Sequence, residues 1–177
     1  MPTVFACFLA FLALALPSSP DVAATSHRGP FRELHLYETH TQEHLDIVYR
    51  YGDHYDPEAL KTLDHFLRDH RTGDVSDYDP RVFDLLADLE DALGKKDVEI
   101  SVVCGYRTPW SNQFLRRRSS AVAKHSLHMR ALAIDIRIPG VTTEALRDAA
   151  LHLHRGGVGY YHREQFVHVD VGRVRRW

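Results

Sequence analysis

Cysteine is scarce in this 177-residue sequence, which contains only Cys7 and Cys104. Cys7 lies in an apolar amino-terminal segment that we expect to be removed, so Cys104 would remain alone and no disulfide could form within the mature chain. An excess of charge of one sign is also lacking, because 22 Lys and Arg nearly balance 24 Asp and Glu. This balance gives no electrostatic reason to expect a nucleic acid or a membrane surface as a partner.

Long hydrophobic runs are missing except near the amino terminus. The run from Thr3 to Leu16 is too short to span a bilayer comfortably, and the small-residue pattern of a signal peptidase site, Val22-Ala23-Ala24, follows it. We therefore expect residues 1–24 to be a secretory signal peptide. No Lys or Arg precedes the run, so a retained amino-terminal membrane anchor is the alternative.

The sequence also lacks internal repeats, low-complexity tracts and a linker that would divide it. A chain of this length can bury a core of its own. Residues 25–177 are therefore predicted to form a single domain, which we expect to be monomeric and free of the membrane once processed.

The pattern of apolar residues predicts mixed secondary structure. Residues 32–56 alternate apolar and polar positions around the stretch ETHTQE, which is typical of a β-hairpin. Two helices follow, with Asp56 and Asp79 as caps before proline and with expected ends near Gly73 and Gly94.

The second half of the chain continues this mixture. A β-rich run ends in the turn GYRTP, after which Thr108 caps a third helix, and a fourth helix is capped by Thr142 or Thr143. Residues 132–138 form a strand, and residues 156–172 form a closing hairpin. Because strands and helices do not alternate regularly, we predict an α+β fold with an antiparallel sheet rather than a doubly wound sheet.

Histidine is abundant, with thirteen residues, and this number suggests a metal site without locating it. Asp135 is unusual because a carboxylate inside the apolar run LAIDIRI would be costly unless it were paired. His128 could lie in the loop entering that strand and His168 on another strand, which would make a three-ligand zinc site with an open position. The alternative is that Asp135 pairs with an arginine and that the histidines fill polar positions in the core.

Four motifs in order give the chain a resemblance to a known family: GYRTP, SLHMRALAIDIRIPG, RGGVGYY and FVHVDVGRVRRW. With LYETHTQE and LRDHRTGDV, the similarity extends over nearly all of residues 32–177. The chain resembles the bacterial murein endopeptidase K-like family of the M15 zinc metallopeptidases. This family belongs to a wider group with the D-alanyl-D-alanine dipeptidases and the hedgehog fold, in which helices pack on a small antiparallel sheet.

The resemblance implies a secreted, periplasmic zinc endopeptidase that cleaves peptide cross-links of peptidoglycan, at bonds involving meso-diaminopimelate. Carried over residue by residue, it implies one zinc ion held by His128, Asp135 and His168. It also implies that Arg107 lies beside the substrate carbonyl, although an arginine in a turn can equally cap the turn or pair with an acid. Whether a D,D or an L,D bond is cleaved stays open.

Three residues are candidates for the general base. Asp170 shares a strand face with His168, about 6.6 Å away between Cα atoms, and could be the base or a partner of that histidine. His162 has the same parity, and a turn could bring it back toward the metal. Glu164 is the third candidate, and a structural role is the alternative for each of the three.

Several other features have simpler interpretations. We expect Arg116–Arg118 to be a solvated helix end, the glycines of RGGVGYY to allow a tight turn and close backbone approach, and Cys104 to be a buried residue rather than a nucleophile. A competing function of another class is a noncatalytic, zinc-stabilised module that binds the cell wall.

Overall fold

The computed structural model describes residues 30–177, so the expected signal peptide, residues 1–24, lies outside the described residues. The described chain forms one eight-stranded sheet with strand order β3-β2-β1-β4-β5-β7-β6-β8. The strands are β1 (Phe31–Glu38), β2 (His44–Tyr51), β3 (His54–Tyr55), β4 (Glu99–Cys104), β5 (Ala133–Arg137), β6 (Gly157–Tyr161), β7 (Phe166–Asp170) and β8 (Arg175–Arg176). The helices are α1 (Pro57–Phe66), α2 (Arg81–Leu93), α3 (Pro109–Arg116) and α4 (Thr143–Leu153), with a 3-10 turn at Leu127–Arg130.

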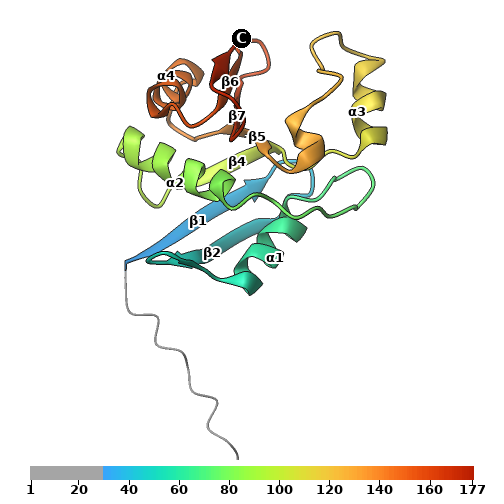
Figure 1. Cartoon of the computed structure of the whole chain (residues 1–177). Helices are drawn as coiled ribbons and strands as arrows, with labels where there is room; N and C mark the ends of the chain where they lie inside the picture. The colour runs from blue at the N-terminus through green and yellow to red at the C-terminus, as the bar shows by residue number, and fades with distance from the viewer. Residues whose placement is uncertain (1–29) are drawn as a thin grey trace, which may run out of the picture.

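The sheet confirms the predicted α+β class and both predicted hairpins, β1 with β2 and β6 with β7. It is mixed rather than wholly antiparallel, since β1 pairs with β4 in parallel and β6 pairs with β8 in parallel. In Figure 1, α2 lies in front of the sheet with α1 and α4 to either side of it, while α3 stands apart at the other end of the molecule. Helix contacts agree with this view, because α1 contacts β2, α2 contacts β1 and α4, and α4 contacts β6 and β7.

Local sequence signals set most helix ends, but the cap of α2 is Pro80, without a side-chain cap hydrogen bond, rather than the predicted Asp79. The Asp56 carboxylate accepts hydrogen bonds from the backbone N–H groups of Glu58 and Ala59, and Thr108 caps α3 in the same way. Thr142 caps α4, which decides between the two threonines proposed from the sequence.

Helix α1 ends at Phe66, well before the Gly73 expected from the sequence. The carbonyl of Leu67 accepts the N–H of Tyr106, and Asp69 accepts the N–H and hydroxyl of Thr108. These bonds tie the segment to the GYRTP turn instead of continuing the helix, so a long-range contact overrode the local pattern.

The strands in the middle of the sheet have two different faces. Ile134, Ile136, Val167 and Val169 are almost completely buried in the hydrophobic core. The residues between them, including Asp135, project to the opposite face because side chains alternate along a strand. Within residues 30–177, no helix is long and apolar enough to cross a bilayer.

Candidate metal centre

Three polar side chains form a row across adjacent strands. Asp135 on β5 pairs with His168 on β7, and Cys104 on β4 pairs with Asp135 from the other side. The register of β4 with β5 shifts between Val102 and Cys104. Directly opposed residues on neighbouring strands have Cβ atoms about 5 Å apart, so the register itself brings these side chains together.

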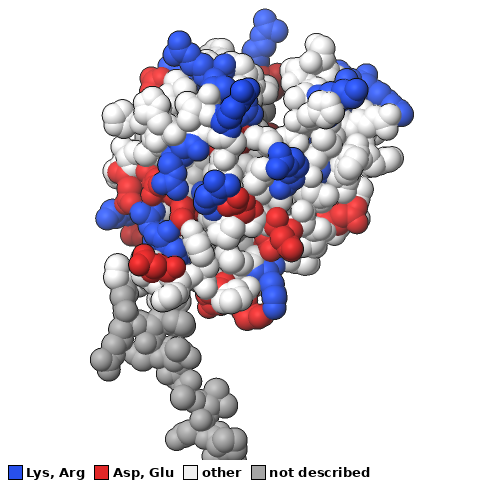
Figure 2. Space-filling view, in the orientation of Figure 1, with Lys and Arg blue, Asp and Glu red and all other residues white. Residues whose placement is uncertain are grey.

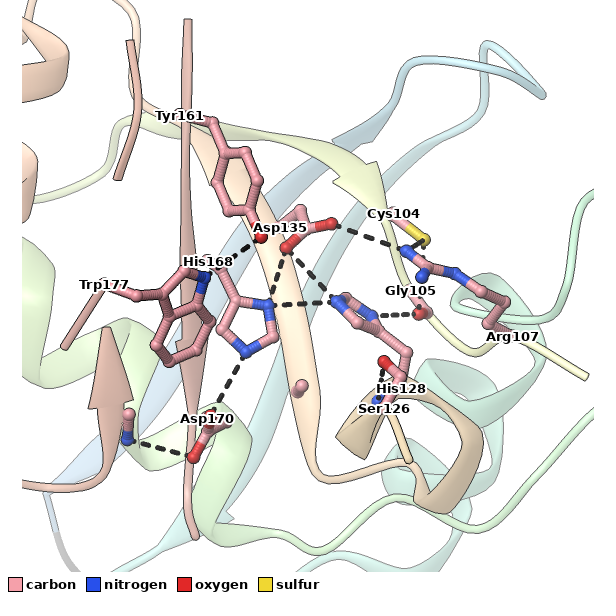
Figure 3. A network of polar contacts seen from close by, with 12 residues as sticks. Cys104, Gly105, Arg107, Ser126, His128, Asp135, Tyr161, His168, Asp170 and Trp177 are labelled. Atoms are coloured by element: carbon pink, nitrogen blue, oxygen red, sulfur yellow. Dashed lines mark hydrogen bonds and ion pairs between the residues drawn. The ribbon is translucent and has the colours of Figure 1, made fainter. Parts of the chain in front are cut away.

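His128 reaches this row from the 3-10 turn that precedes β5. The turn begins at Ser126, whose hydroxyl accepts the N–H of His128. His128 Nε2 then lies 3.1 Å from Asp135 Oδ1 and 3.1 Å from His168 Nδ1, and His168 Nδ1 lies 2.8 Å from the same carboxylate oxygen. Figure 3 shows these three atoms pointing toward one another, as expected for the predicted ligands His128, Asp135 and His168.

The hydrogen bonds of the two imidazoles define which of their nitrogen atoms carry lone pairs. His128 Nδ1 lies 2.8 Å from the carbonyl of Gly105, which can only accept, so Nδ1 donates and Nε2 keeps a lone pair. His168 Nε2 lies 3.1 Å from the carboxylate of Asp170, so Nε2 donates and Nδ1 keeps a lone pair. With neutral imidazoles, two nitrogen lone pairs and an Asp135 oxygen therefore face one another with no hydrogen between them.

This donor set fits zinc, because imidazole nitrogen and carboxylate oxygen are ordinary zinc ligands. The negative charge of Asp135 also favours protons on the neighbouring groups. Burial alone would lower the pKa of His128, but the adjacent Asp135 carboxylate and the Cys104 thiol raise it to about 10. Burial opposes ionisation of Asp135, yet His128 and His168 hold the pKa of its carboxyl well below the usual range.

Arg107 contacts the other oxygen of Asp135. Its Nη2 lies 3.8 Å from Asp135 Oδ2 and donates to Cys104 Sγ at 3.3 Å, while Nη1 donates to Asn112. Asp135 thus has an arginine on one oxygen and two histidines on the other, so both interpretations of this residue from the sequence describe part of its surroundings.

Cys104 is buried, as predicted, but it is closer to the centre than the sequence indicated. Its sulfur and the ligand atoms of His128 and Asp135 all lie within 4.8 Å of one another. Burial raises the pKa of the thiol, but His128 and Arg107 outweigh burial and lower it.

Asp170 lies behind His168 and is completely buried. Its Oδ1 accepts the N–H groups of Gly157 and Gly172, and Arg175 donates to both carboxylate oxygens. Burial opposes its ionisation, but the hydrogen bonds from His168 and Arg175 lower the pKa of Asp170 well below the usual range. These contacts match a partner that orients His168, the second of the two roles predicted from the sequence.

The other two candidate bases lie in the turn between β6 and β7 and face different cavities. The exposed side chain of His162 contacts Tyr160 and Glu144 and borders a cavity beside α4. Glu164 instead borders the cleft that contains His128 and His168. Of the three candidates, Glu164 is the one that lines this cleft.

The cleft has a volume of about 420 Å³. One side is formed by Leu115 of α3 and the following loop, and the other by Tyr161, Phe166 and Trp177. Figure 1 shows the corresponding elements, with α3 on one side and β6 and β7 on the other. A peptide could enter between these walls.

Two other groups of residues were singled out from the sequence. Arg116–Arg118 are exposed at the end of α3, as expected. In Figure 2, Lys and Arg side chains gather toward the top of the view, over α3 and the carboxy-terminal strands, while both signs of charge mix below. The glycines of RGGVGYY permit close backbone approach, as expected, but Gly157 and Gly159 lie within β6 rather than in a turn.

Sequence reasoning missed the role of the carboxy terminus in this site. Arg175 and Trp177 line the cleft, and the Trp177 indole lies with its ring centre 5.1 Å from that of His168. Trp177 Nε1 donates to the hydroxyl of Tyr161 at 3.1 Å. The motif FVHVDVGRVRRW contained the signal, because it links both residues to His168 within a few positions.

Comparison with known proteins gives one consistent family. A family model described as peptidoglycan L,D-endopeptidase MepK matches residues 26–177. A Haemophilus influenzae protein named probable peptidoglycan L,D-endopeptidase MepK is 40% identical over 168 residues, which cover 94% of this chain and 90% of that protein. The peptidoglycan L,D-endopeptidase MepK of Escherichia coli K12 is 39% identical over 166 residues, again covering 94% of this chain and 90% of the relative. No solved structure matches the chain.

Proposed function

The chain belongs to the peptidoglycan L,D-endopeptidase MepK family of M15 metallopeptidases, and from this we propose that it hydrolyses L,D peptide cross-links of peptidoglycan with one zinc ion per chain. The observation that carries the proposal is the convergence of His128 Nε2, Asp135 Oδ1 and His168 Nδ1 in the cleft. The names of the relatives favour the L,D bond over the D,D bond. We extend the proposal to cross-links that involve meso-diaminopimelate.

His128, Asp135 and His168 would hold the zinc. When bound at such a site, zinc polarises a scissile carbonyl and lowers the pKa of a bound water molecule. Two neutral imidazoles and a single carboxylate would leave a net positive charge on the bound zinc. The Gly105 carbonyl and the Asp170 carboxylate fix the two histidine rings in the tautomers that binding requires.

Arg107 and Glu164 complete the proposed site. Arg107 lines the cleft beside Asp135 and would stabilise negative charge that develops on the carbonyl oxygen. If a carboxylate of this chain accepts the proton of the attacking water, Glu164 is the candidate placed to do so, because Asp170 is buried behind His168.

The function is tested with purified muropeptide dimers, one cross-linked through an L,D bond and the other through a D,D bond. We expect the L,D dimer to be converted to monomers, activity to disappear with a strong chelator, and activity to return with Zn²⁺. Mass spectrometry of the products identifies the bond. Intact L,D dimers in the presence of stoichiometric zinc would favour the noncatalytic wall-binding module.

Glu164→Gln tests the proton acceptor. The substitution keeps the size of the side chain and removes its charge, so bound zinc should stay at one per chain while kcat falls by about 10²-fold or more. Glu144→Gln is the matched control, since Glu144 borders the other cavity and contacts Tyr160. Full activity of Glu164→Gln would exclude Glu164 as the base.

We also propose that residues 1–24 are a signal peptide and that residues 25–177 act as a single, monomeric domain in the periplasm. The support is the short apolar run followed by Val22-Ala23-Ala24 and the cell-wall substrate named for the relatives. Amino-terminal sequencing of protein isolated from cells should start near Thr25. An intact Met1 on membrane-extracted protein would support the retained anchor instead.

A further inference from the structure

The row of polar residues across the sheet ends at a glycine. His168 on β7 pairs with Gly159 on β6, so the position beside the imidazole has no side chain of its own. The Trp177 indole occupies this space. A Cβ atom added to Gly159 would lie 2.7 to 2.8 Å from three indole atoms, which shows how closely the ring covers the strand.

Backbone pairing holds Trp177 in this place. Its N–H donates to the carbonyl of Val158, and its carbonyl accepts the N–H of Tyr160. The indole N–H is bonded to Tyr161, and the ring lies beside His168. Trp177 is therefore fixed through both its backbone and its side chain.

Arg175, two residues before Trp177, contacts Asp170, the carboxylate that accepts a hydrogen bond from His168. Its Nη2 lies 2.8 Å from Asp170 Oδ2, the oxygen that accepts from His168 Nε2. The guanidinium also lies over the Trp177 ring, with Cζ 4.9 Å from the ring centre. Trp177 and Arg175 thus contact both the His168 ring and the carboxylate behind it.

We propose that Arg175 and Trp177 position His168 for metal binding: Arg175 fixes Asp170 against Nε2, and Trp177 stops the imidazole ring from turning. These are positioning residues, since neither is proposed to touch zinc. The inference rests on the proposed zinc site and adds to it a requirement for Arg175 and Trp177.

Restraint of the ring matters because a histidine that binds zinc must present one particular nitrogen to the metal at a defined angle. A histidine on a strand can rotate about two side-chain bonds, and the hydrogen bond to Asp170 restrains only one edge of the ring. Contact with the indole adds a second restraint on the ring. Groups that orient metal ligands in this way typically change metal affinity or activity by about 10- to 100-fold when they are replaced.

The first test uses the fact that the chain has only two tryptophans, Trp110 and Trp177. Trp110→Phe leaves Trp177 as the sole indole, beside His168, and Trp177→Phe leaves only Trp110, which is exposed on α3. Titration of the metal-free proteins with Zn²⁺ should change the fluorescence of Trp110→Phe and leave that of Trp177→Phe unchanged. The reverse pattern would overturn the placement of Trp177.

The second test measures zinc affinity by competition with a chromophoric chelator, which needs no turnover. Trp177→Ala and Arg175→Ala should each weaken zinc binding by about 10- to 100-fold, with Arg175→Lys recovering part of the loss. Arg176→Ala is the matched control, because Arg176 lies in the same strand but does not border the cleft. It should bind zinc as the unmodified protein does.

Gly159→Ala keeps the test decisive if Trp177→Ala fails to fold. The added methyl group displaces the indole of a terminal residue without removing it, so zinc affinity should again fall. Unchanged zinc affinity in folded Trp177→Ala, Arg175→Ala and Gly159→Ala, with only a lower melting temperature of the metal-free protein, would overturn the inference. Failure of the unmodified protein to bind zinc would instead overturn the proposed function.

Discussion

Alanine at His128, Asp135 or His168 is expected to abolish hydrolysis of the L,D-linked dimer and to remove most of the bound zinc. Each substitution deletes one of three atoms that lie 2.8 to 3.1 Å apart. A three-ligand site cannot lose one donor and keep tight binding. Zinc content is measured by elemental analysis after dialysis, and turnover by chromatography of the muropeptides.

His152→Ala provides the control for this experiment, since His152 is an exposed histidine on α4. It should retain one zinc and full activity. A full equivalent of zinc in the Asp135→Ala protein would show that the ligand set is wrong. The carboxylate in the apolar strand would then be explained by its contact with Arg107 alone.

Asp170→Asn is expected to weaken zinc binding by about 10- to 100-fold and to destabilise the metal-free fold by about 1–3 kcal/mol. The Asp170 carboxylate accepts from two backbone N–H groups, Arg175 and His168. An amide has one oxygen and one NH₂ group, so the asparagine would direct hydrogens at groups that are themselves donors. Chemical denaturation and chelator competition measure the two effects.

This experiment separates the two roles predicted for Asp170. A general base would leave zinc near one per chain and lower only the turnover, whereas a partner of His168 changes metal affinity. Asp148→Asn is the control, because Asp148 is exposed and its carboxylate pairs with Arg147, far from the site. Full zinc affinity with a reduced kcat in Asp170→Asn would instead support Asp170 as the general base.

The sequence by itself determined most of the local structure and the family. Asp56-Pro57 and Thr108-Pro109 begin helices because the cap side chain and the proline act within a few residues. Alternation of apolar residues predicted the central strands and showed that Asp135 had to face something other than the core. Motifs close to His128 and His168 indicated the family, which the comparisons confirm.

Only the tertiary structure decided which of these residues meet. The pairing of Asp135 with His168 depends on a hydrogen-bond register between strands far apart in the sequence, and a shift of one residue would move both side chains to other neighbours.

The two-residue alternation along a strand placed Asp170 on the same face as His168, but the contacts of Asp170 with Arg175 and two backbone N–H groups come from other strands and turns. The alternation of side chains along a strand does not hold within a turn, so His162 faces one cavity and Glu164 another. Trp177 reaches His168 because β8 pairs with β6 and Gly159 leaves space for it, a long-range arrangement that no local pattern encodes.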